Sequence, residues 1–138
     1  MFSKILVAID GSRSAKRAFT RSIYLAGKCN SMLDVVHVVP CEFGGDSAKT
    51  FELVEELKVK ASDILEECKR IAVKNNISIK TSYELGDPAK IIIGLANSKD
   101  YDLVVMGSRG RSAFKELLLG SVALKVAHHA KCPIMVVR

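Results

Sequence analysis

Long hydrophobic runs are missing from this sequence of 138 residues. A helix needs about 20 consecutive apolar residues to cross a bilayer, and no segment approaches that length, which excludes a membrane-spanning chain. The first residues, Met1–Lys4, lead directly into a strand-like run without the parts of a secretory signal peptide, so we expect a cytoplasmic protein. Apolar residues make up 49% and charged residues 26% of the chain, which is typical of a globular domain.

Patterns of a metal centre or of a disulfide framework are also lacking. The four cysteines include no Cys-x-x-Cys pair, and a domain of this size does not need disulfides, so we expect free thiols. Cys68 falls on the apolar side of a helical pattern and is expected in the core. His128 and His129 are adjacent and point in different directions on a helix, so they do not easily chelate one ion. We expect no zinc site.

Aromatic residues are scarce, at 6% with no tryptophan, although the formal net charge is +6. Proteins that bind single-stranded nucleic acid stack bases on aromatic side chains, and this sequence offers few. Arg13, Lys16, Arg17 and Arg21 lie on one face of a predicted helix, which is more typical of a solvated helix than of a nucleic-acid contact. We expect no nucleic-acid partner.

Several catalytic and nucleotide-binding motifs are absent. The sequence has neither G-x-x-x-x-G-K-[ST] nor a G-x-G-x-x-G after its first strand, which argues against P-loop and dinucleotide-type sites. It has no G-x-S-x-G nucleophile elbow. His37 lies within a predicted strand, where a histidine is usually packed or hydrogen-bonded, and no histidine or cysteine is expected beside a matching partner at the strand ends. We therefore predict no catalytic residues.

The sequence does contain a regular alternation of strand-like and helical patterns. Apolar runs predict strands at 4–10, 32–39, 77–85, 101–106 and 133–137. Helical spacing of apolar residues predicts helices at about 14–28, 54–74, 89–98 and 119–130. Strands joined by helices predict an α/β fold, a doubly wound parallel sheet with helices on both faces, in which residues 1–138 form one domain.

Glycine and hydroxyl residues follow the fourth predicted strand, with Gly107, Gly110, Gly120 and Ser121 at the key positions. Glycines let backbone N–H groups approach a phosphate, and a helix start such as that near Ser121 favours an anion. Further donors suited to phosphate oxygens are Ser108, Arg109, Arg111 and Ser112. The same residues fit a plain turn followed by a helix cap, and the residues alone leave both interpretations open.

Asp10 follows the first predicted strand. Aspartate is common at such a turn for purely structural reasons. If the first and fourth strands are neighbours, its carboxylate is also placed to accept hydrogen bonds from ribose hydroxyls or a base amine.

Over its full length the chain resembles the universal stress protein family, in its ATP-binding branch. The family motif G-2x-G-9x-G-[S/T] is matched at every spacing by Gly107, Gly110, Gly120 and Ser121. The opening K-I-L-V-A-I-D-G-S, the strand V-V-H-V-V and the closing C-P-I-M-V-V-R are also similar. This resemblance implies a five-stranded sheet in the order 3-2-1-4-5.

The resemblance also implies that ATP binds between the first and fourth strands, with Mg²⁺ or Mn²⁺ held through the phosphates. Ala8, Ile9 and Asp10 then line the nucleoside pocket, with Asp10 near the ribose, and Val38 meets the adenine through its backbone. The residues expected around the phosphates are Gly107, Ser108, Arg109, Gly110, Arg111, Ser112, Gly120, Ser121 and Val122.

Members of the family typically pair through the last strand, here Pro133 to Val137, which implies a homodimer. The expected function is that of a nucleotide-dependent regulator or sensor in the stress response, acting on an unknown protein partner. The alternative is a slow ATP-hydrolysing enzyme with partner-dependent turnover, because no general base is evident beside the glycine loop.

Overall fold

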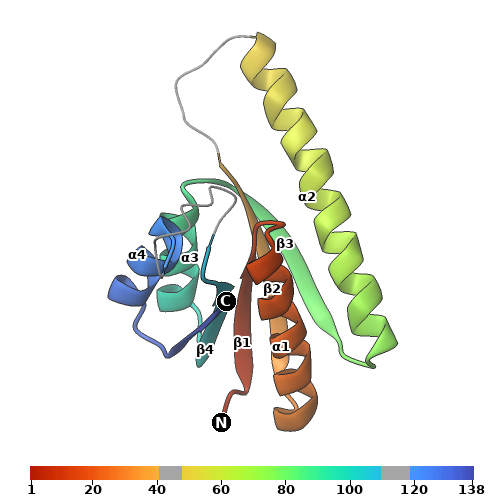
Figure 1. The fold of residues 1–138 in the computed structure, drawn as a ribbon, viewed down its shortest axis with the longest axis vertical. Coiled ribbons are helices and arrows are strands. Elements are labelled where there is room, and N and C mark those ends of the chain that lie inside the picture. The colour runs from red at the N-terminus through yellow and green to blue at the C-terminus, as the bar shows by residue number, and fades with distance from the viewer. Residues whose placement is uncertain (41–47, 110–118) are drawn as a thin grey trace.

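A computed structural model describes residues 1–40, 48–109 and 119–138, along which strands and helices alternate (Figure 1). The strands are β1 (Lys4–Ile9), β2 (Met32–Pro40), β3 (Ile79–Gly86), β4 (Leu103–Gly107) and β5 (Ile134–Val137). The helices are α1 (Arg13–Cys29), α2 (Ala48–Lys74), α3 (Pro88–Ser98) and α4 (Ser121–His129).

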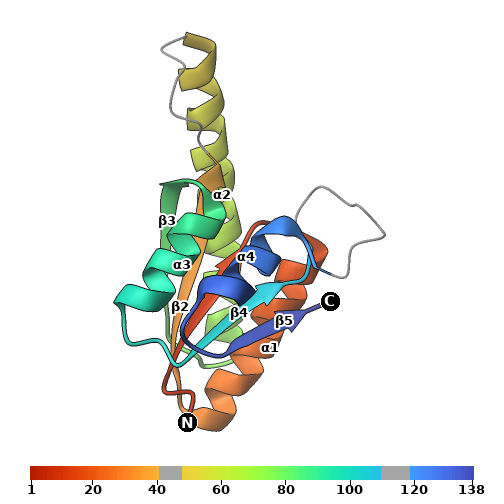
Figure 2. The same ribbon diagram turned by 90° about the vertical axis from the view of Figure 1, so that its left-hand side faces the viewer.

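The five strands form one parallel sheet in the order β3-β2-β1-β4-β5. Strand β1 is central, and it pairs with β2 on one side and with β4 on the other. Helices α1 and α2 pack on one face of the sheet and α3 and α4 on the other (Figures 1 and 2). The predicted fold class and strand order are confirmed.

Successive residues of β1 serve two separate cores, because neighbouring side chains of a strand point to opposite faces. Ile5, Val7 and Ile9 pack with α1 and α2, whereas Leu6 and Ala8 pack with α3 and α4. All five are buried. Burying a side chain of the size of leucine or isoleucine contributes about 1.5–3 kcal/mol, so this central strand anchors both layers.

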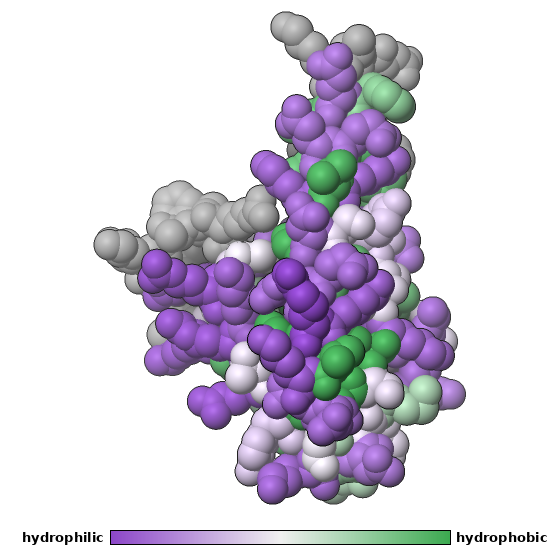
Figure 3. Space-filling view, turned by 90° about the vertical axis from the view of Figure 1, so that its right-hand side faces the viewer, coloured by the Kyte–Doolittle hydropathy of each residue, from purple (hydrophilic) through white to green (hydrophobic). Residues whose placement is uncertain are grey.

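Helix α2 begins earlier than its apolar pattern predicts, at Ala48 rather than near Val54. Its N-terminal half extends beyond the end of the sheet (Figure 1), and none of residues 50–60 is buried. Figure 3 faces the side of the molecule on which α2 lies and shows mostly hydrophilic side chains there. A helix segment without a core-facing stripe has no periodicity from which its start can be predicted.

Helix α4 begins later than predicted, at Ser121 rather than near Leu119. Gly120 has an extended backbone, with φ −68° and ψ 168°, and is the N-cap of the helix. Leu119 therefore precedes the helix, although it still packs against the core on the α3 and α4 side.

The expectation of free thiols holds for Cys29, Cys68 and Cys132, the cysteines that the structure describes. Cys68 lies on the buried side of α2, as predicted. Burial raises the pKa of its thiol to about 11, with a smaller contribution from the Glu67 carboxylate. A thiol of this kind stays protonated and contributes to packing rather than to chemistry.

None of the helices in the described ranges is long and apolar enough to cross a membrane.

Asp87 is the N-cap of α3, and we expect it to make this helix sensitive to acid. Its Oδ1 accepts a hydrogen bond from the Lys90 N–H at 3.0 Å, and this bond lowers the pKa of the carboxyl group. A lowered pKa in the folded state adds stability above the unfolded pKa, and this stability is lost as the pH falls through the folded pKa, which lies below the ordinary value of an aspartate. We expect Asp87→Asn to keep a neutral N-cap, because asparagine caps helices as well as aspartate does. It should lose the acid-dependent part of the stability, because an amide does not titrate.

The measurement is the melting temperature of wild type and Asp87→Asn between about pH 2 and 7. The advantage of the wild type should shrink as the pH falls, while Asp87→Ala should melt below both proteins at neutral pH. Identical acid slopes for wild type and Asp87→Asn would contradict this role of the carboxylate.

Candidate functional site

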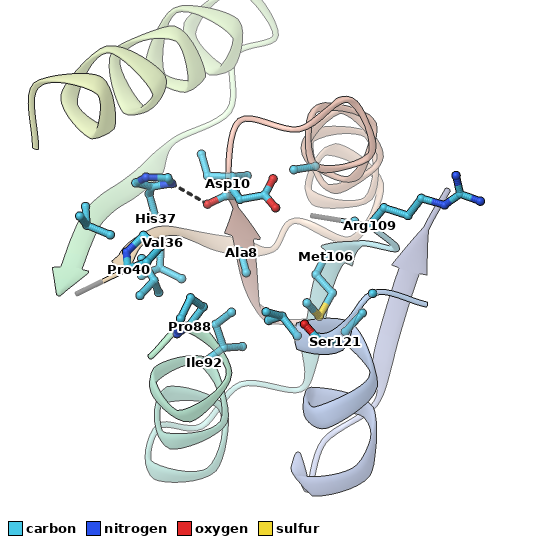
Figure 4. A pocket seen from close by; sticks show the side chains of 18 of the residues that line it. Ala8, Asp10, Val36, His37, Pro40, Pro88, Ile92, Met106, Arg109 and Ser121 are labelled. Atoms are coloured by element: carbon cyan, nitrogen blue, oxygen red, sulfur yellow. Dashed lines mark hydrogen bonds between the residues drawn. The ribbon is translucent and has the colours of Figure 1, made fainter. Parts of the chain in front are cut away.

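A cavity of about 650 Å³ lies at the carboxyl ends of β1, β2 and β4 (Figure 4). Doubly wound sheets bind ligands at this edge, where the strand order reverses, and ligand cavities usually have volumes of about 300–1,000 Å³. The described residues that line the cavity are Ala8, Ile9, Asp10, Ala15, Val36, His37, Val38, Val39, Pro40, Leu57, Lys60, Pro88, Ile92, Met106, Gly107, Ser108, Arg109, Gly120, Ser121, Val122 and Ala123.

The floor of the cavity is apolar. Ala8 on β1 lies between Val36 on β2 and Met106 on β4, which are its partners in the sheet. These three side chains point to the face covered by α3 and α4, where Ile92 of α3 packs with them (Figure 4). The small side chain of Ala8 leaves room above the central strand. This floor can therefore hold a flat, largely apolar group such as an aromatic ring.

The N-terminus of α4 forms another part of the cavity wall. Gly120 caps the helix without a side-chain hydrogen bond, and Ser121 is the first helical residue. The Gly120 N–H donates to the Ser108 carbonyl at 2.6 Å, which holds the helix start against the end of β4. The amides of Ser121 and Val122 have no acceptor within the helix, because the first turn never provides one. Together with the helix dipole they favour an anion at this end of the cavity.

A hydroxyl group fastens the start of α1 to the end of β4. The Ser14 Oγ donates to the Arg109 carbonyl at 2.8 Å and lies 3.3 Å from the Arg109 N–H, which donates to it. Ser12 rather than Ser14 is the N-cap of α1, since its Oγ accepts from the Ala15 N–H at 3.2 Å. Gly107 lies against this first turn, and any side chain there would collide with it.

A histidine joins the ends of β1 and β2. The Nδ1 atom of the buried His37 lies 2.8 Å from the Ile9 carbonyl (Figure 4). Because a carbonyl only accepts, Nδ1 carries the proton in this bond. His37 is the last β2 residue paired with β1, whereas Val38–Pro40 are paired only with β3 among the described strands. The edge of β2 that faces β1 is thus left without a strand partner at Val38, beside the cavity.

Charged groups lie around the cavity rather than on its floor. The Asp10 Oδ1 accepts a hydrogen bond from the Ser12 N–H at 2.9 Å, and Gly11 between them has a positive φ of 83°. Lys60 reaches the cavity from α2, whereas the side chain of Arg109 points away from its middle (Figure 4). Within the described ranges, no three His, Cys, Asp or Glu side chains are grouped so as to hold a metal ion.

Residues 1–138, the whole chain, match the sequence profile of the universal stress protein family. The chain belongs to the universal stress protein family. It is 36% identical to Universal stress protein YxiE of Bacillus subtilis over 148 residues, an alignment that spans 100% of both proteins.

Solved structures of universal stress proteins share this fold. Universal stress protein UspA from Lactobacillus plantarum superposes with a TM-score of 0.91 at 25% identity, covering 99% of this chain and 98% of that one. A universal stress protein in complex with cAMP superposes with a TM-score of 0.77 at 26% identity, covering 99% and 97% of the two chains.

The predicted site residues that the structure describes lie together at the cavity. Those that line the cavity are Ala8, Ile9, Asp10, Val38, Gly107, Ser108, Arg109, Gly120, Ser121 and Val122. Gly110, Arg111 and Ser112 lie outside the described residues. Contact of any of these residues with a nucleotide stays a prediction.

The sequence analysis missed several residues that line the cavity of this universal stress protein. The alternation of side chains along β2 and β4 could have pointed to Val36 and Met106, which lie beside Ala8. His37 is hydrogen-bonded, as expected for a histidine in a strand, and its partner is the Ile9 carbonyl of β1. It also lines the cavity, where no histidine was expected. Leu57 and Lys60 come from the projecting half of α2, and no sequence signal placed them near the strand ends.

Proposed function

We propose that this universal stress protein binds ATP in the cavity between β1 and β4 and acts in the cytoplasm as a nucleotide-dependent regulator of the stress response. The observation that carries this proposal is the pairing of two features in one cavity. An apolar floor around Ala8 suits an adenine ring, and the α4 N-terminus at Gly120 and Ser121 suits phosphates. The relative crystallised with cAMP supports an adenine nucleotide as the ligand class.

The proposed orientation of ATP follows from the positions of the apolar floor and of the α4 N-terminus in the cavity. The adenine lies over Ala8 beside the main chain of Val38, whose strand edge has no partner from β1. Asp10 lies near the ribose, and the phosphates extend toward the amides of Ser121 and Val122. Main-chain N–H and C=O groups at Val38 would form hydrogen bonds with the edge of the base. Adenine and guanine differ in their donors and acceptors there, so adenine should be preferred to guanine.

We propose that Mg²⁺ or Mn²⁺ accompanies the nucleotide. Such ions prefer oxygen ligands and are commonly held by one or two carboxylates together with phosphates and water. The described residues offer no cluster of three ligating side chains, so phosphate oxygens and water would supply most of the coordination, with Asp10 as the nearby carboxylate on the cavity.

The β5 edge supports a homodimer as the working unit. Among the strands of the described ranges, β5 pairs with β4 alone, and all four of its residues are half-buried in the isolated chain. Its side chains are apolar on both faces, with Met135 and Val137 on one side and Ile134 and Val136 on the other. An open apolar edge invites pairing with a second strand, and the segment Pro133 to Val137 of a second copy is the proposed partner.

One native mass-spectrometry experiment tests the nucleotide and the dimer together. We expect the protein as purified to have the mass of two chains with one ATP each, and denaturation should release ATP for identification by chromatography. Added ATP with Mg²⁺ should bind about tenfold more tightly than GTP, the effect of one hydrogen bond worth about 1.4 kcal/mol.

Other outcomes separate the alternatives. Slow conversion of ATP to ADP by the purified protein would favour the ATP-hydrolysing alternative, and rapid conversion would exclude a protein that only binds and senses ATP. Release of cAMP or AMP in place of ATP would keep the site and change its ligand. A protein that is purified empty and does not bind ATP with Mg²⁺ would overturn the proposed function.

A further inference from the structure

Every charged residue on the exposed side of α1 is basic. The helix contains Arg13, Lys16, Arg17, Arg21 and Lys28 and no acidic residue. All five side chains are exposed, so one helix presents five positive charges in a chain whose net charge is +6. Like charges this close on one helix repel each other, which is tolerated only because water and counterions screen them.

Helix α2, in contrast, forms ion pairs among its own charged side chains. It carries six acidic and six basic residues, and its ion pairs run within the helix between neighbouring turns. The pairs are Lys58 with Glu55, Lys69 with Glu66, and Arg70 with Glu67. In the parts of the chain that the structure describes, no ion pair involves a basic side chain of α1. Among these residues the positive face of α1 is therefore uncompensated.

A groove of about 530 Å³ lies between the C-terminal half of α1 and the end of α2. Its walls include the apolar side chains of Ile23, Ile71 and Ile77, with Thr20, Tyr24, Lys28 and Asn75 as polar or amphipathic lining. Gly27 leaves space in the α1 wall of the groove. A Cβ at this position would lie in contact with the Ile77 Cδ1 atom, at 3.7 Å, and would fill part of that space.

The groove continues into exposed surface. Tyr24 is 64% exposed beside it, and the Lys28 Nζ lies 5.5 Å from the centre of the Tyr24 ring. Across the groove, Ile71 of α2 and Ile77, which follows that helix, are half-buried. Figure 3 shows an apolar patch among hydrophilic side chains in the lower half of this side of the molecule. Apolar groups gathered beside a charged stripe are typical of a contact surface.

We propose that this surface binds an acidic amphipathic helix of another protein. Apolar side chains of that helix would enter the groove over Ile71 and Ile77, and its carboxylates would lie along Arg17 and Arg21. The mode is that of a helix docked in a groove, with charge complementarity giving orientation and specificity. The proposal does not depend on the nucleotide site, because none of these residues lines the larger cavity.

Two other occupants fit the surface less well. A second copy of this chain would bring a second basic stripe against the first, and like charges facing each other across an interface are unfavourable. A nucleic acid would satisfy the charge, but it would leave the isoleucine-lined groove without a matching group, and Tyr24 is the only aromatic side chain among its described lining residues.

Binding of a designed peptide tests the proposal directly. The probe is a fluorescent helical peptide of about 18 residues, with leucine on one face and glutamate on the other. Fluorescence anisotropy should show binding that weakens as salt is added. A peptide of the same composition in scrambled order, one with lysine in place of glutamate, and a short DNA duplex are the controls, and each should bind at least about tenfold more weakly.

Matched variants separate the two parts of the surface. Arg17→Glu with Arg21→Glu should weaken binding of the peptide at least about tenfold, whereas Lys99→Glu with Lys131→Glu, the same charge change elsewhere, should leave it within about twofold. Gly27→Leu should fill the groove and weaken binding. Gly94→Leu should not, because Gly94 lies on α3 and a Cβ added to it would meet no atom within 4 Å. Circular dichroism checks that each variant folds.

Four results would overturn the proposal. Equal losses in the two double variants would assign the binding to net charge alone. Equal binding of the scrambled peptide, or no binding of the acidic peptide, would remove the groove as a helix site. Tighter binding of the DNA duplex than of the peptide would make α1 a nucleic-acid surface instead.

Discussion

Gly107→Ala lowers the free energy of unfolding by at least about 2 kcal/mol, the largest effect on stability that we expect from a single methyl group in this protein. A Cβ at this position would lie 2.6 Å from the Ala15 nitrogen and 2.8 Å from the Ser14 carbonyl carbon, and it would also collide with the Ser14 Oγ. Two of these atoms belong to the backbone, so relief of the clash requires the whole first turn of α1 to move away from β4.

That movement should also disturb the ligand site. The Ser14 hydroxyl would lose its hydrogen bonds to Arg109, which hold the end of β4 against α1. Urea denaturation measures the stability, and Gly94→Ala is the matched control, because a Cβ there meets nothing within 4 Å. The control should be as stable as wild type or more stable by up to about 1 kcal/mol. A Gly107→Ala protein within about 0.5 kcal/mol of wild type would contradict the close approach of α1 and β4.

Ala8→Leu should weaken ATP binding at least about 100-fold, or about 2.7 kcal/mol, without unfolding the protein. Ala8 lies on the central strand under the cavity, and the larger side chain would occupy the space assigned to adenine (Figure 4). Ala8 belongs to the core and also lines the cavity. The added atoms should enter the cavity, so the ligand-free protein should stay folded without a large loss of stability.

Isothermal titration calorimetry with ATP and Mg²⁺ measures this effect. Ala127→Leu adds the same atoms on the exposed side of α4 and should bind ATP as the wild type does. Unchanged affinity in a folded Ala8→Leu protein would mean that the nucleotide does not lie over the central strand. A large loss of stability in the ligand-free Ala8→Leu protein would mean that this part of the cavity is smaller than the structure indicates.

Helix and strand positions were largely predictable where the core imposes a pattern. The buried strands β1 and β4 are short apolar runs, and α1 shows its buried residues at helical spacing. The start of α2 was not predictable, because none of residues 50–60 is buried and the apolar spacing begins only at Val54. The start of α4 depended on the extended backbone of Gly120, which no periodicity reveals.

Candidate site residues were predictable only in part. The spacing of Gly107, Gly120 and Ser121 pointed to this edge of the sheet through the family motif, whereas composition left a plain turn equally open. The family motif suggested that Gly107 lets the backbone approach a phosphate. The structure gives another reason for glycine at this position, because the first turn of α1 occupies the space that a side chain would need. The hydrogen bonds of Ser14 to Arg109, 95 residues away, became evident only in the fold.

The sequence determined the alternation of strands and helices, the parallel sheet and the family, because each of these leaves a local pattern of apolar residues or a fixed spacing. The tertiary structure decided which residues that are far apart in the sequence come into contact. It brought Ile9 to His37, Ala8 to Met106, and the basic side of α1 to the groove beside α2. Such contacts depend on strand pairing and helix packing, which no local stretch of sequence encodes.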